Sequence, residues 1–453
     1  MDVNDVLVVV LAAALAGMWW RWCSKTGGVD GLPPGPPGWP VVGNLFQVIL
    51  QRRPFMAPMF ASRPEDSPTR LLFSVGKCTV NSAPYGPLWR ALRRNFVAEI
   101  VSPHRVKSFS WIREWAVDAH LRRLRAELNA EGAVRVMAGC RLTICSILIC
   151  ICFGAKIPDE LIREIEEVLK DVMMISLPKL PDFLPSSRRS SGSSCPRPAP
   201  CAAASSTASR RSSARGGTSS ATATRGRRRR RAAWEMMSRP GEAYVDSLFD
   251  LEPPGRGKRL GEEELVTLCS EVMSAGTDTS ATALEWAMMH LILDPAAQER
   301  LYDEVVAKAG KTARITEADV EAMPYLQAVV KETFRRHPPS HFVLSHAATR
   351  DTELGGYRVP ADASVEFYTA WVTENPATWP DPELWRPERF LEGGEGFDTD
   401  ITGTRALRMM PFGAGRRICP AATLGVLHIQ LMLANMVRAF RWTPPPARTA
   451  GSY

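Results

Sequence analysis

The sequence predicts a mainly α-helical protein with minor β structure and an N-terminal membrane anchor. Of its 453 residues, 45% are hydrophobic, which is enough for a large buried core. Apolar residues recur at helical spacing over most of the chain after Tyr85, and strand-like segments are few and short. An uncharged apolar run near the N-terminus is the third observation, because runs of that kind enter membranes.

The apolar run extends from Val6 to Trp20 and is followed by Arg21 and Lys25. As a helix it spans about 22 Å, and tryptophans at its end extend it into the interface of a bilayer about 30 Å thick. A cleaved signal peptide is the alternative, although the chain starts with acidic rather than basic residues. We expect residues 1–22 to form a retained anchor, and the basic, proline-rich residues 23–45 to form a stiff hinge.

Residues 46–453 form the expected globular body. The helix over 262–293 is apolar on nearly all sides, which indicates a central, buried position. In all, apolar spacing predicts helices over residues 89–100, 112–129, 134–153, 161–175, 262–293, 296–309 and 319–336, and strands near residues 352–360 and 364–367.

Residues 186–233 interrupt this body with a tract of Ser, Ala, Arg, Pro, Thr, Gly and Cys. Without large apolar residues the tract does not offset the entropy cost of ordering, so we expect it to be disordered. Its twelve arginines, subtracted from the net charge of +8, leave −4 for the rest of the chain. Three interpretations stay open: a segment that binds RNA or directs localisation, a disordered loop, or coding sequence read in the wrong frame.

Near the C-terminus, the stretch PFGAGRRICP surrounds Cys419 with glycines and arginines. A thiolate is the form of cysteine that ligates metals, and nearby arginine lowers its pKa. Gly415 lets the backbone approach a flat ligand, Phe412 can pack near the sulfur, and Arg417 can meet a carboxylate on that ligand. A helix beginning after Cys419 directs the positive end of its dipole at the sulfur.

This stretch resembles the haem-binding loop of the cytochrome P-450 superfamily, Phe-x-x-Gly-x-Arg-x-Cys-x-Gly. The resemblance makes Cys419 the axial ligand of haem iron and implies the cytochrome P-450 fold. Ala421 departs from the pattern, which has glycine at that position. The stretch Asn81-Ser-Ala-Pro-Tyr-Gly-Pro-Leu-Trp89 makes the chain most similar to plant microsomal members, near family 89.

Two motifs upstream of the cysteine also match the family. Glu332-Thr-Phe-Arg335 resembles its Glu-x-x-Arg motif, and Pro387-Glu-Arg-Phe390 resembles the segment whose arginine, here Arg389, completes a buried triad. A solvated helical ion pair is the alternative for Glu332 and Arg335. The resemblance implies that the triad locks the segment under the haem.

The stretch Ala275-Gly-Thr-Asp-Thr-Ser280 lies midway along the long central helix. The resemblance makes Gly276 part of a groove over the haem, and makes Asp278 and Thr279 the acid–alcohol pair that relays protons to dioxygen. A kink at the glycine is the alternative.

Trp89 and Arg93 lie four residues apart, so their side chains point in the same direction from one helix. The resemblance implies that both contact a haem propionate, with His346 as a further propionate partner. An amphipathic surface helix is the alternative. Arg90 and Arg94 offer cations to an acidic reductase surface.

The resemblance implies a monooxygenase that inserts one oxygen atom from O2 into a small apolar organic substrate. It implies haem b as cofactor, and NADPH as electron source through NADPH–cytochrome P-450 reductase, with cytochrome b5 as a second possible donor. We expect the anchor to hold the body on the cytoplasmic face of the endoplasmic reticulum membrane, in plant secondary metabolism, and we expect no nucleic-acid partner.

The family pattern is broken in three places. Between Gly43 and Trp89 the chain is shorter than the family layout, so part of the first helix and of the main sheet is expected to be absent. Residues 186–233 take the place of the helices that roof the substrate cavity, and the chain stops at Tyr453, before a family hairpin. Two other functions therefore stay open: a catalytically impaired, haem-binding homologue, and a membrane-tethered, arginine-rich RNA-binding protein.

Overall fold

The computed structural model describes residues 62–63, 77–175, 243–311, 314–354, 356–361, 363–402 and 407–445. The chain divides into a helical unit (Asp66–Leu177, Ser193–His341 and Thr369–Tyr453) and a sheet unit (Met1–Glu65, Pro178–Gly192 and Phe342–Tyr368). The anchor expected at residues 1–22, the hinge at 23–45 and the tract at 186–233 lie outside the described residues.

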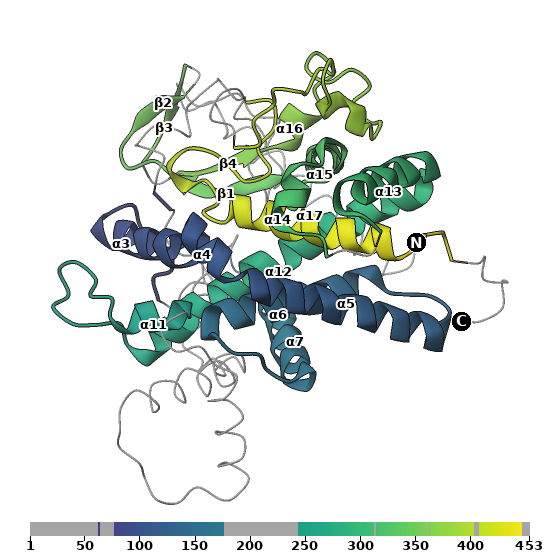
Figure 1. The fold of residues 1–453 in the computed structure, drawn as a ribbon. Helices are drawn as coiled ribbons and strands as arrows, with labels where there is room; N and C mark the ends of the chain where they lie inside the picture. Colours follow the sequence, from purple (N-terminus) through teal and green to yellow (C-terminus); the bar gives the residue numbers. More distant parts are fainter. Residues whose placement is uncertain are drawn as a thin grey trace, which may run out of the picture. The chain divides into compact units, whose positions relative to one another are not determined.

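The helical unit is built from long helices joined by turns and short helical segments (Figure 1). Its elements are α3 (Pro87–Phe96), the π-helical η3 (Val97–Val101), α4 (Pro103–Ser108), α5 (Ser110–Glu131), α6 (Val136–Phe153), α7 (Asp159–Ile175), α11 (Tyr244–Phe249), α12 (Glu262–Leu293), α13 (Pro295–Ala309), α14 (Glu317–Glu321), α15 (Pro324–Arg336), α16 (Ala370–Thr373), the 3₁₀ turns η5 (Pro387–Phe390) and η6 (Gly415–Arg417), and α17 (Ala422–Ala439). The mainly helical fold predicted from the sequence is confirmed for the described residues.

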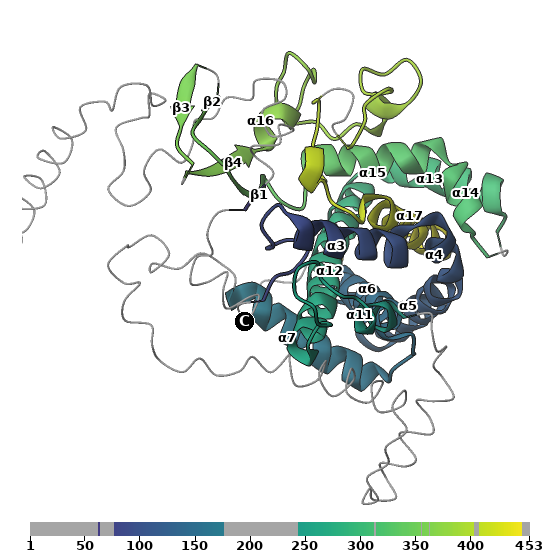
Figure 2. The ribbon, with the colours of Figure 1, turned by 90° about the vertical axis from the view of Figure 1, so that its left-hand side faces the viewer.

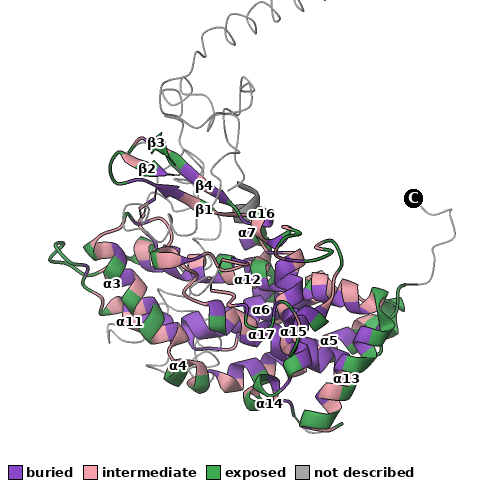
Figure 3. Ribbon diagram, turned by 90° about the horizontal axis from the view of Figure 1, so that it is seen from above, coloured by how far each residue is buried: buried purple, intermediate pink, exposed green. Residues whose placement is uncertain are grey.

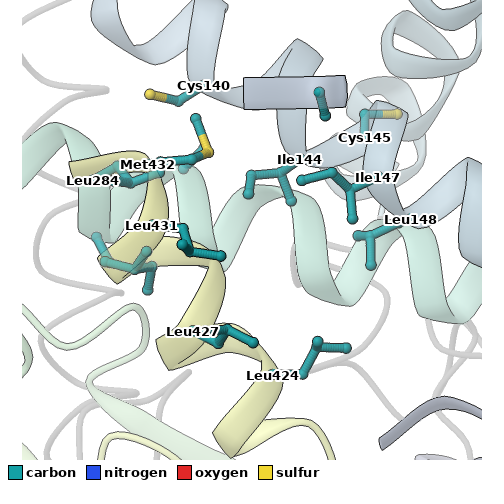
Figure 4. Close-up of a cluster of buried hydrophobic side chains, with 14 of the residues drawn as sticks. Cys140, Ile144, Cys145, Ile147, Leu148, Leu284, Leu424, Leu427, Leu431 and Met432 are labelled. Atoms are coloured by element: carbon teal, nitrogen blue, oxygen red, sulfur yellow. The ribbon is translucent and has the colours of Figure 1, made fainter. Parts of the chain in front are cut away.

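The core of the helical unit lies where α12 packs on α6 and α17. Figure 4 shows Ile144 and Leu148 of α6, Leu284 of α12, and Leu427 and Met432 of α17 in one cluster, and all five are buried. Figure 2 shows α11 beside α6 and α12, and the three helices are in contact. Figure 3 shows the described residues of α6 and α17 largely buried, with exposed residues on the outer turns of α13.

Among the described residues, α6 is the one helix long and apolar enough to cross a membrane, with a mean hydropathy of 2.2. Within the protein, 72% of that helix is buried. Burial of this extent is typical of a core helix, so α6 adds nothing to the expectation of an anchor at residues 1–22, which stays a prediction.

Side chains and glycines at the helix ends explain where several helices begin and end. Asp294 caps α13, because its carboxylate accepts hydrogen bonds from the backbone N–H groups of Ala296 at 3.1 Å and Ala297 at 3.0 Å. α5 and α6 end at Gly132 and Gly154, whose φ angles of 70° and 66° suit the left-handed cap that glycine adopts freely.

The single helix predicted over residues 319–336 is wrong. The structure has α14 and then α15, which begins at Pro324, and Met323 between them has a non-helical φ of −106° and ψ of 88°. Proline disfavours the helical conformation of the residue before it. The new helix start is capped by Glu304 of α13, which accepts from the backbone N–H groups of Tyr325 and Leu326 at 2.8 Å each.

The described residues of the sheet unit form two antiparallel pairs, β1 (Phe342–Ala347) with β4 (Ser364–Tyr368), and β2 (Thr352–Leu354) with β3 (Tyr357–Val359). The strand predicted near residues 352–360 is thus a hairpin, which turns at Gly356 with a φ of 84°. The sequence analysis missed β1. Its register shifts between Val343 and His346, and Arg63 donates to the carbonyls of Leu344 and Ser345 there at 2.8 Å each.

Candidate active site

Cys419 lies in the loop between η6 and α17. Gly413 and Gly415 adopt φ angles of 67° and 70° in this loop, a left-handed conformation that glycine adopts without strain. The Cys419 N–H donates to the Phe412 carbonyl at 2.8 Å and fixes the loop. Because α17 begins at Ala422, the positive end of its dipole lies next to this cysteine.

Opposing effects act on the Cys419 thiol. Burial raises the pKa of the thiol, whereas a hydrogen bond from the Ala421 N–H and the charge of Arg93 lower that pKa. The net direction is upward, so a bound metal cation is what favours the thiolate. Ala421 has a φ of −101° and a ψ of 19°, a conformation open to alanine, so its departure from glycine brings no backbone strain.

Two arginines reach this loop. Arg93 of α3 donates from Nη2 to the Ile418 carbonyl at 2.7 Å, and burial lowers the pKa of Arg93, an effect that nearby Cys419 opposes. The guanidinium of Arg417 lies 4.6 Å from the ring centre of Trp89. Burial, followed by the charge of Arg93, lowers the pKa of Arg417 to about 10. Partly buried cations beside one cysteine favour an anionic ligand.

The structure thus brings Trp89, Arg93, Arg417 and Cys419 together. Trp89 donates from Nε1 to the Val80 carbonyl at 3.1 Å, and Arg93 donates to a loop carbonyl. The contacts of Trp89 and Arg93 with a haem propionate, which the sequence suggested, therefore stay predictions, because both donors bond to the backbone here.

The donor set of this loop fits an iron porphyrin. The sulfur of Cys419 is a soft ligand suited to iron, and Arg93 and Arg417 provide positive charge for the two carboxylates that a haem carries. Phe412 lies next to the loop and packs edge-to-face on Phe334, with ring centres 5.1 Å apart. Sulfur, cations and an aromatic wall are what a haem-thiolate site requires.

Asp278 and Thr279 are adjacent on α12 but bond to different partners. The carboxylate of Asp278 forms an ion pair with Arg141 of α6, and Arg141 also donates to Glu166 of α7 at 2.7 Å. The exposed hydroxyl of Thr279 donates to the Ala275 carbonyl at 2.7 Å. The proton relay expected for this pair stays a prediction, and Arg141 is a partner that the sequence did not indicate.

Gly276 of α12 lies against the side chain of Leu148 of α6. A Cβ atom at Gly276 would lie 2.7 Å from Cδ1 of Leu148, which Figure 4 shows in the core cluster. The close approach of the two helices is therefore sufficient to explain a glycine here. The expected role of Gly276 in cofactor binding stays a prediction.

The structure brings Glu332, Arg335 and Arg389 together in the interior. Arg335 donates to the Glu332 carboxylate at 2.7 and 2.8 Å, and Nε of Arg389 lies 3.4 Å from the same carboxylate. Arg335 also donates to the carbonyls of Thr373 and Leu384. The cluster therefore ties α15 to the segment that follows it, and its support of a haem stays a prediction.

His346 belongs to β1 of the sheet unit. Its side chain is buried, and its ring packs edge-to-face on Phe367 of β4, with ring centres 5.6 Å apart. This packing accounts for a histidine inside the strand pair. Contact of His346 with a haem propionate stays a prediction.

The sequence analysis missed Glu271 of α12. Its carboxylate accepts hydrogen bonds from the backbone N–H groups of Val80 at 2.9 Å and Asn81 at 2.7 Å. The available signal was an acidic residue within a largely apolar stretch of the central helix, five positions before Gly276.

The family comparison matches residues 57–451 with the family described as "Cytochrome P450". "Cytochrome P450 89A9" of Arabidopsis thaliana is 31% identical over 464 residues, which cover 91% of this chain and 88% of that protein. "Cytochrome P450 78A1" of Zea mays is 34% identical over 398 residues, which cover 87% of this chain and 71% of that protein.

Solved structures agree on the fold. A zebrafish cytochrome P450 determined with abiraterone superimposes with a TM-score of 0.65 and 20% identity, covering 86% of this chain and 83% of that chain. The family match covers most of the chain, and relatives above 30% identity agree with it. This chain therefore belongs to the cytochrome P-450 family of haem-dependent monooxygenases and is similar to plant family 89.

Proposed function

We propose that this protein is a microsomal cytochrome P-450 that inserts one oxygen atom from O2 into a small apolar substrate of plant secondary metabolism. Cys419 would hold the iron of haem b, and electrons would come from NADPH through NADPH–cytochrome P-450 reductase, with cytochrome b5 as an accessory donor. The observation that carries this proposal is the geometry of the loop at Cys419, where the Cys419 N–H donates to the Phe412 carbonyl at 2.8 Å and Arg93 donates to the Ile418 carbonyl at 2.7 Å.

The residues around the loop have separate tasks in this proposal. When bound, the haem supplies the electron transfer and dioxygen activation. Cys419 holds the iron, and the Ala421 N–H tunes the sulfur by hydrogen bonding. Arg93 and Arg417 orient the flat ligand by binding its carboxylates.

Proton delivery is assigned to α12. Asp278 holds a proton-accepting carboxylate next to Thr279, whose hydroxyl is exposed. Because Arg141 forms an ion pair with Asp278, transfer of a proton by this carboxylate requires that Arg141 turn toward Glu166, to which it also bonds.

Membrane and partner assignments come from the sequence and from the relatives. Residues 1–22 anchor the protein in the endoplasmic reticulum membrane, with the catalytic body facing the cytoplasm. Arg90 and Arg94 are exposed on α3, next to the loop that Arg93 reaches, and they offer positive charge to an acidic reductase. The flavonoid 3'-monooxygenase of Arabidopsis thaliana, 28% identical over 461 residues, favours an aromatic plant metabolite as substrate.

The test is the absorption spectrum of the reduced, carbon-monoxide-bound protein, because the Soret band of such a haem depends on thiolate ligation. Wild type is expected to show the thiolate-type band and Cys419→Ala is expected to lose it. Cys140→Ala, which removes another buried thiol from α6, is the matched control and is expected to keep the band. A Cys419→Ala protein with an unchanged band contradicts the proposal.

A second measurement distinguishes an active enzyme from a catalytically impaired homologue. With reductase and candidate aromatic substrates, the active enzyme consumes NADPH only when O2 is present and forms an oxygenated product. An impaired homologue shows the thiolate-type spectrum but no oxygenated product with any substrate.

A further inference from the structure

The turn formed by residues 79–83 has two hydrogen-bonding edges. On one edge, the Glu271 carboxylate of α12 accepts from the N–H groups of Val80 and Asn81 at 2.9 and 2.7 Å. Two consecutive N–H groups that share one carboxylate make charge-assisted bonds, which are stronger than neutral ones. Glu271 therefore fixes the turn to the central helix.

The other edge of the turn faces the cysteine loop. The Val80 carbonyl accepts from Trp89 Nε1 at 3.1 Å, and the Ala83 carbonyl accepts from Arg417 Nη2 at 2.6 Å. Arg417 also reaches the carbonyls of Val80 and Asn81, at 3.3 and 3.4 Å. The position of the Arg417 guanidinium is therefore set by the backbone of this turn.

The turn is also held by its own side chains. Thr79 N–H donates to the Ser82 hydroxyl at 3.0 Å, and Ser82 N–H donates to the Thr79 hydroxyl at 3.1 Å, while Ala83 N–H donates to the Thr79 carbonyl at 3.0 Å. These bonds join the two edges of the turn, because the peptide groups that donate to Glu271 belong to the same braced segment whose carbonyls accept from Arg417.

The charges at the two edges of the turn also favour a link between Glu271 and Arg417. The peptide groups of the turn present N–H to the negative carboxylate of Glu271 and C=O to the positive guanidinium of Arg417, so their dipoles align with both charges.

We propose that Glu271 is a positioning residue of the haem site, which holds Arg417 and Trp89 in place for the haem carboxylates through the turn at residues 79–83. This inference rests on the proposed function, because it concerns the ligand that Cys419 binds. We place its effect in the backbone of the turn, whose N–H groups bond to Glu271 and whose carbonyls bond to Trp89 and Arg417.

The first test measures haem affinity of the full chain, prepared haem-free and titrated with haem. Glu271→Gln keeps the size of the side chain, removes its charge and places an amide NH2 against a backbone N–H. We expect the haem dissociation constant to rise about tenfold, the equivalent of about 1.4 kcal/mol. Glu285→Gln is the matched control, an exposed glutamate on the same helix, and is expected to bind haem as wild type does.

The second test uses haem dimethyl ester, in which both carboxylates are blocked. If Glu271 acts by positioning Arg417 for these carboxylates, wild type and Glu271→Gln bind the ester with the same affinity. An equal loss with haem and with the ester means that Glu271 only stabilises the fold, and no loss with either means that it has no role. Both results overturn the proposal.

Hydrogen exchange in the haem-free protein checks the link itself. The amides of Val80 and Asn81 are expected to exchange faster in Glu271→Gln than in Glu285→Gln, and unchanged exchange contradicts the proposal.

Should Glu271→Gln not fold, Glu271→Asp is used in its place, because it keeps the charge with a shorter reach. It is expected to weaken the binding of haem by a smaller factor and to leave the binding of the ester unchanged. An equal loss of affinity for haem and for the ester overturns the proposal. Failure of wild type itself to bind haem with a thiolate-type spectrum instead overturns the proposed function.

Discussion

Two clusters of arginine in the helical unit differ in the groups that balance their buried positive charge. At the triad, Arg335 and Arg389 share the carboxylate of Glu332, and all three side chains are at most 1% exposed. At the cysteine loop, Arg93 and Arg417 lie close enough that Arg93 lowers the pKa of Arg417. At the triad, Glu332 supplies a counter-charge in direct contact with both arginines, whereas at the loop two like charges lie near one cysteine and Glu271 only partly opposes the lowering of the Arg417 pKa.

The difference indicates which cluster serves structure and which serves a ligand. A buried ion pair that carries its own counter-charge and also bonds to the backbone, as Arg335 does to the carbonyls of Thr373 and Leu384, needs no outside group. Like charges placed together in a partly buried site cost free energy unless an anion joins them. We propose the carboxylates of a haem as the anions that join these arginines, and the following variants test that contrast.

The largest effect is expected at the triad. Glu332→Gln removes the carboxylate to which Arg335 donates, while Arg389 keeps its ion pair with Glu395. The variant is expected to lower the free energy of unfolding by about 3–5 kcal/mol, measured by denaturant titration. Glu374→Gln is the control: Glu374 pairs with Arg336 at 3.6 Å on the surface, and its loss is expected to cost less than about 1 kcal/mol. Equal losses would show that the triad is not a structural centre.

The loop is expected to respond in its ligand affinity rather than in its stability. Arg93→Gln removes one of two like charges, so the haem-free protein is expected to keep its free energy of unfolding or gain a little. Its haem dissociation constant is expected to rise about 30-fold, or about 2 kcal/mol, as for one charged hydrogen bond. Arg94→Gln, at the exposed neighbour on α3, is the control. A large loss of haem-free stability in Arg93→Gln would erase the contrast.

Gly276 tests whether helix packing alone requires a glycine at a position that was also expected to contribute to the haem site. Gly276→Ala places Cβ 2.7 Å from Leu148 Cδ1 and is expected to cost about 1–2 kcal/mol by overpacking. A double-mutant cycle with Leu148→Ala is expected to show favourable coupling, because the shorter side chain makes room. Additive losses would mean that Gly276 is required by something other than α6.

A buried pair of neutral histidines carries no charge to balance and is expected to have the smallest effect on stability. His290 and His337 lie with their Nε2 atoms 2.8 Å apart, and burial lowers the pKa of each to about 4, against about 6.5 in an unfolded chain. Because the unfolded chain takes up protons first, the free energy of unfolding falls as the pH drops from about 6.5 to about 4.

His337→Asn removes one of these titrating groups. The fall in stability between pH 6.5 and pH 4 is expected to shrink by about 1 kcal/mol, a value reduced for partial exposure to water. Denaturant titrations across this range measure the fall. His104→Asn, at an exposed histidine, is the control, and equal pH dependence in the two variants would contradict the expectation.

Much of the helical unit was predictable from sequence. α12 begins and ends at the predicted residues, Glu262 and Leu293, because its apolar run starts after three glutamates and stops before Pro295. The error at α14 and α15 came from continuing a helix through Pro324, whose missing N–H was a readable signal.

Residues of the candidate site were predictable from the sequence only where they belong to a recognisable motif. Cys419, Arg417 and Glu332 were identified from local spacing. The partners Arg141 and Glu271 were not, because each acts on a segment far away in the chain and its contact depends on how helices pack. Spacing along one helix says which face a side chain occupies but not which distant backbone or charge meets it.

The most direct test of the central claim is X-ray absorption spectroscopy at the iron edge of the haem-loaded protein. Wild type is predicted to show one sulfur in the iron coordination shell, and Cys419→Ala is predicted to lack it, while Arg93→Gln keeps it with weaker haem binding. Iron without a sulfur neighbour in wild type, or with one in Cys419→Ala, would contradict the account.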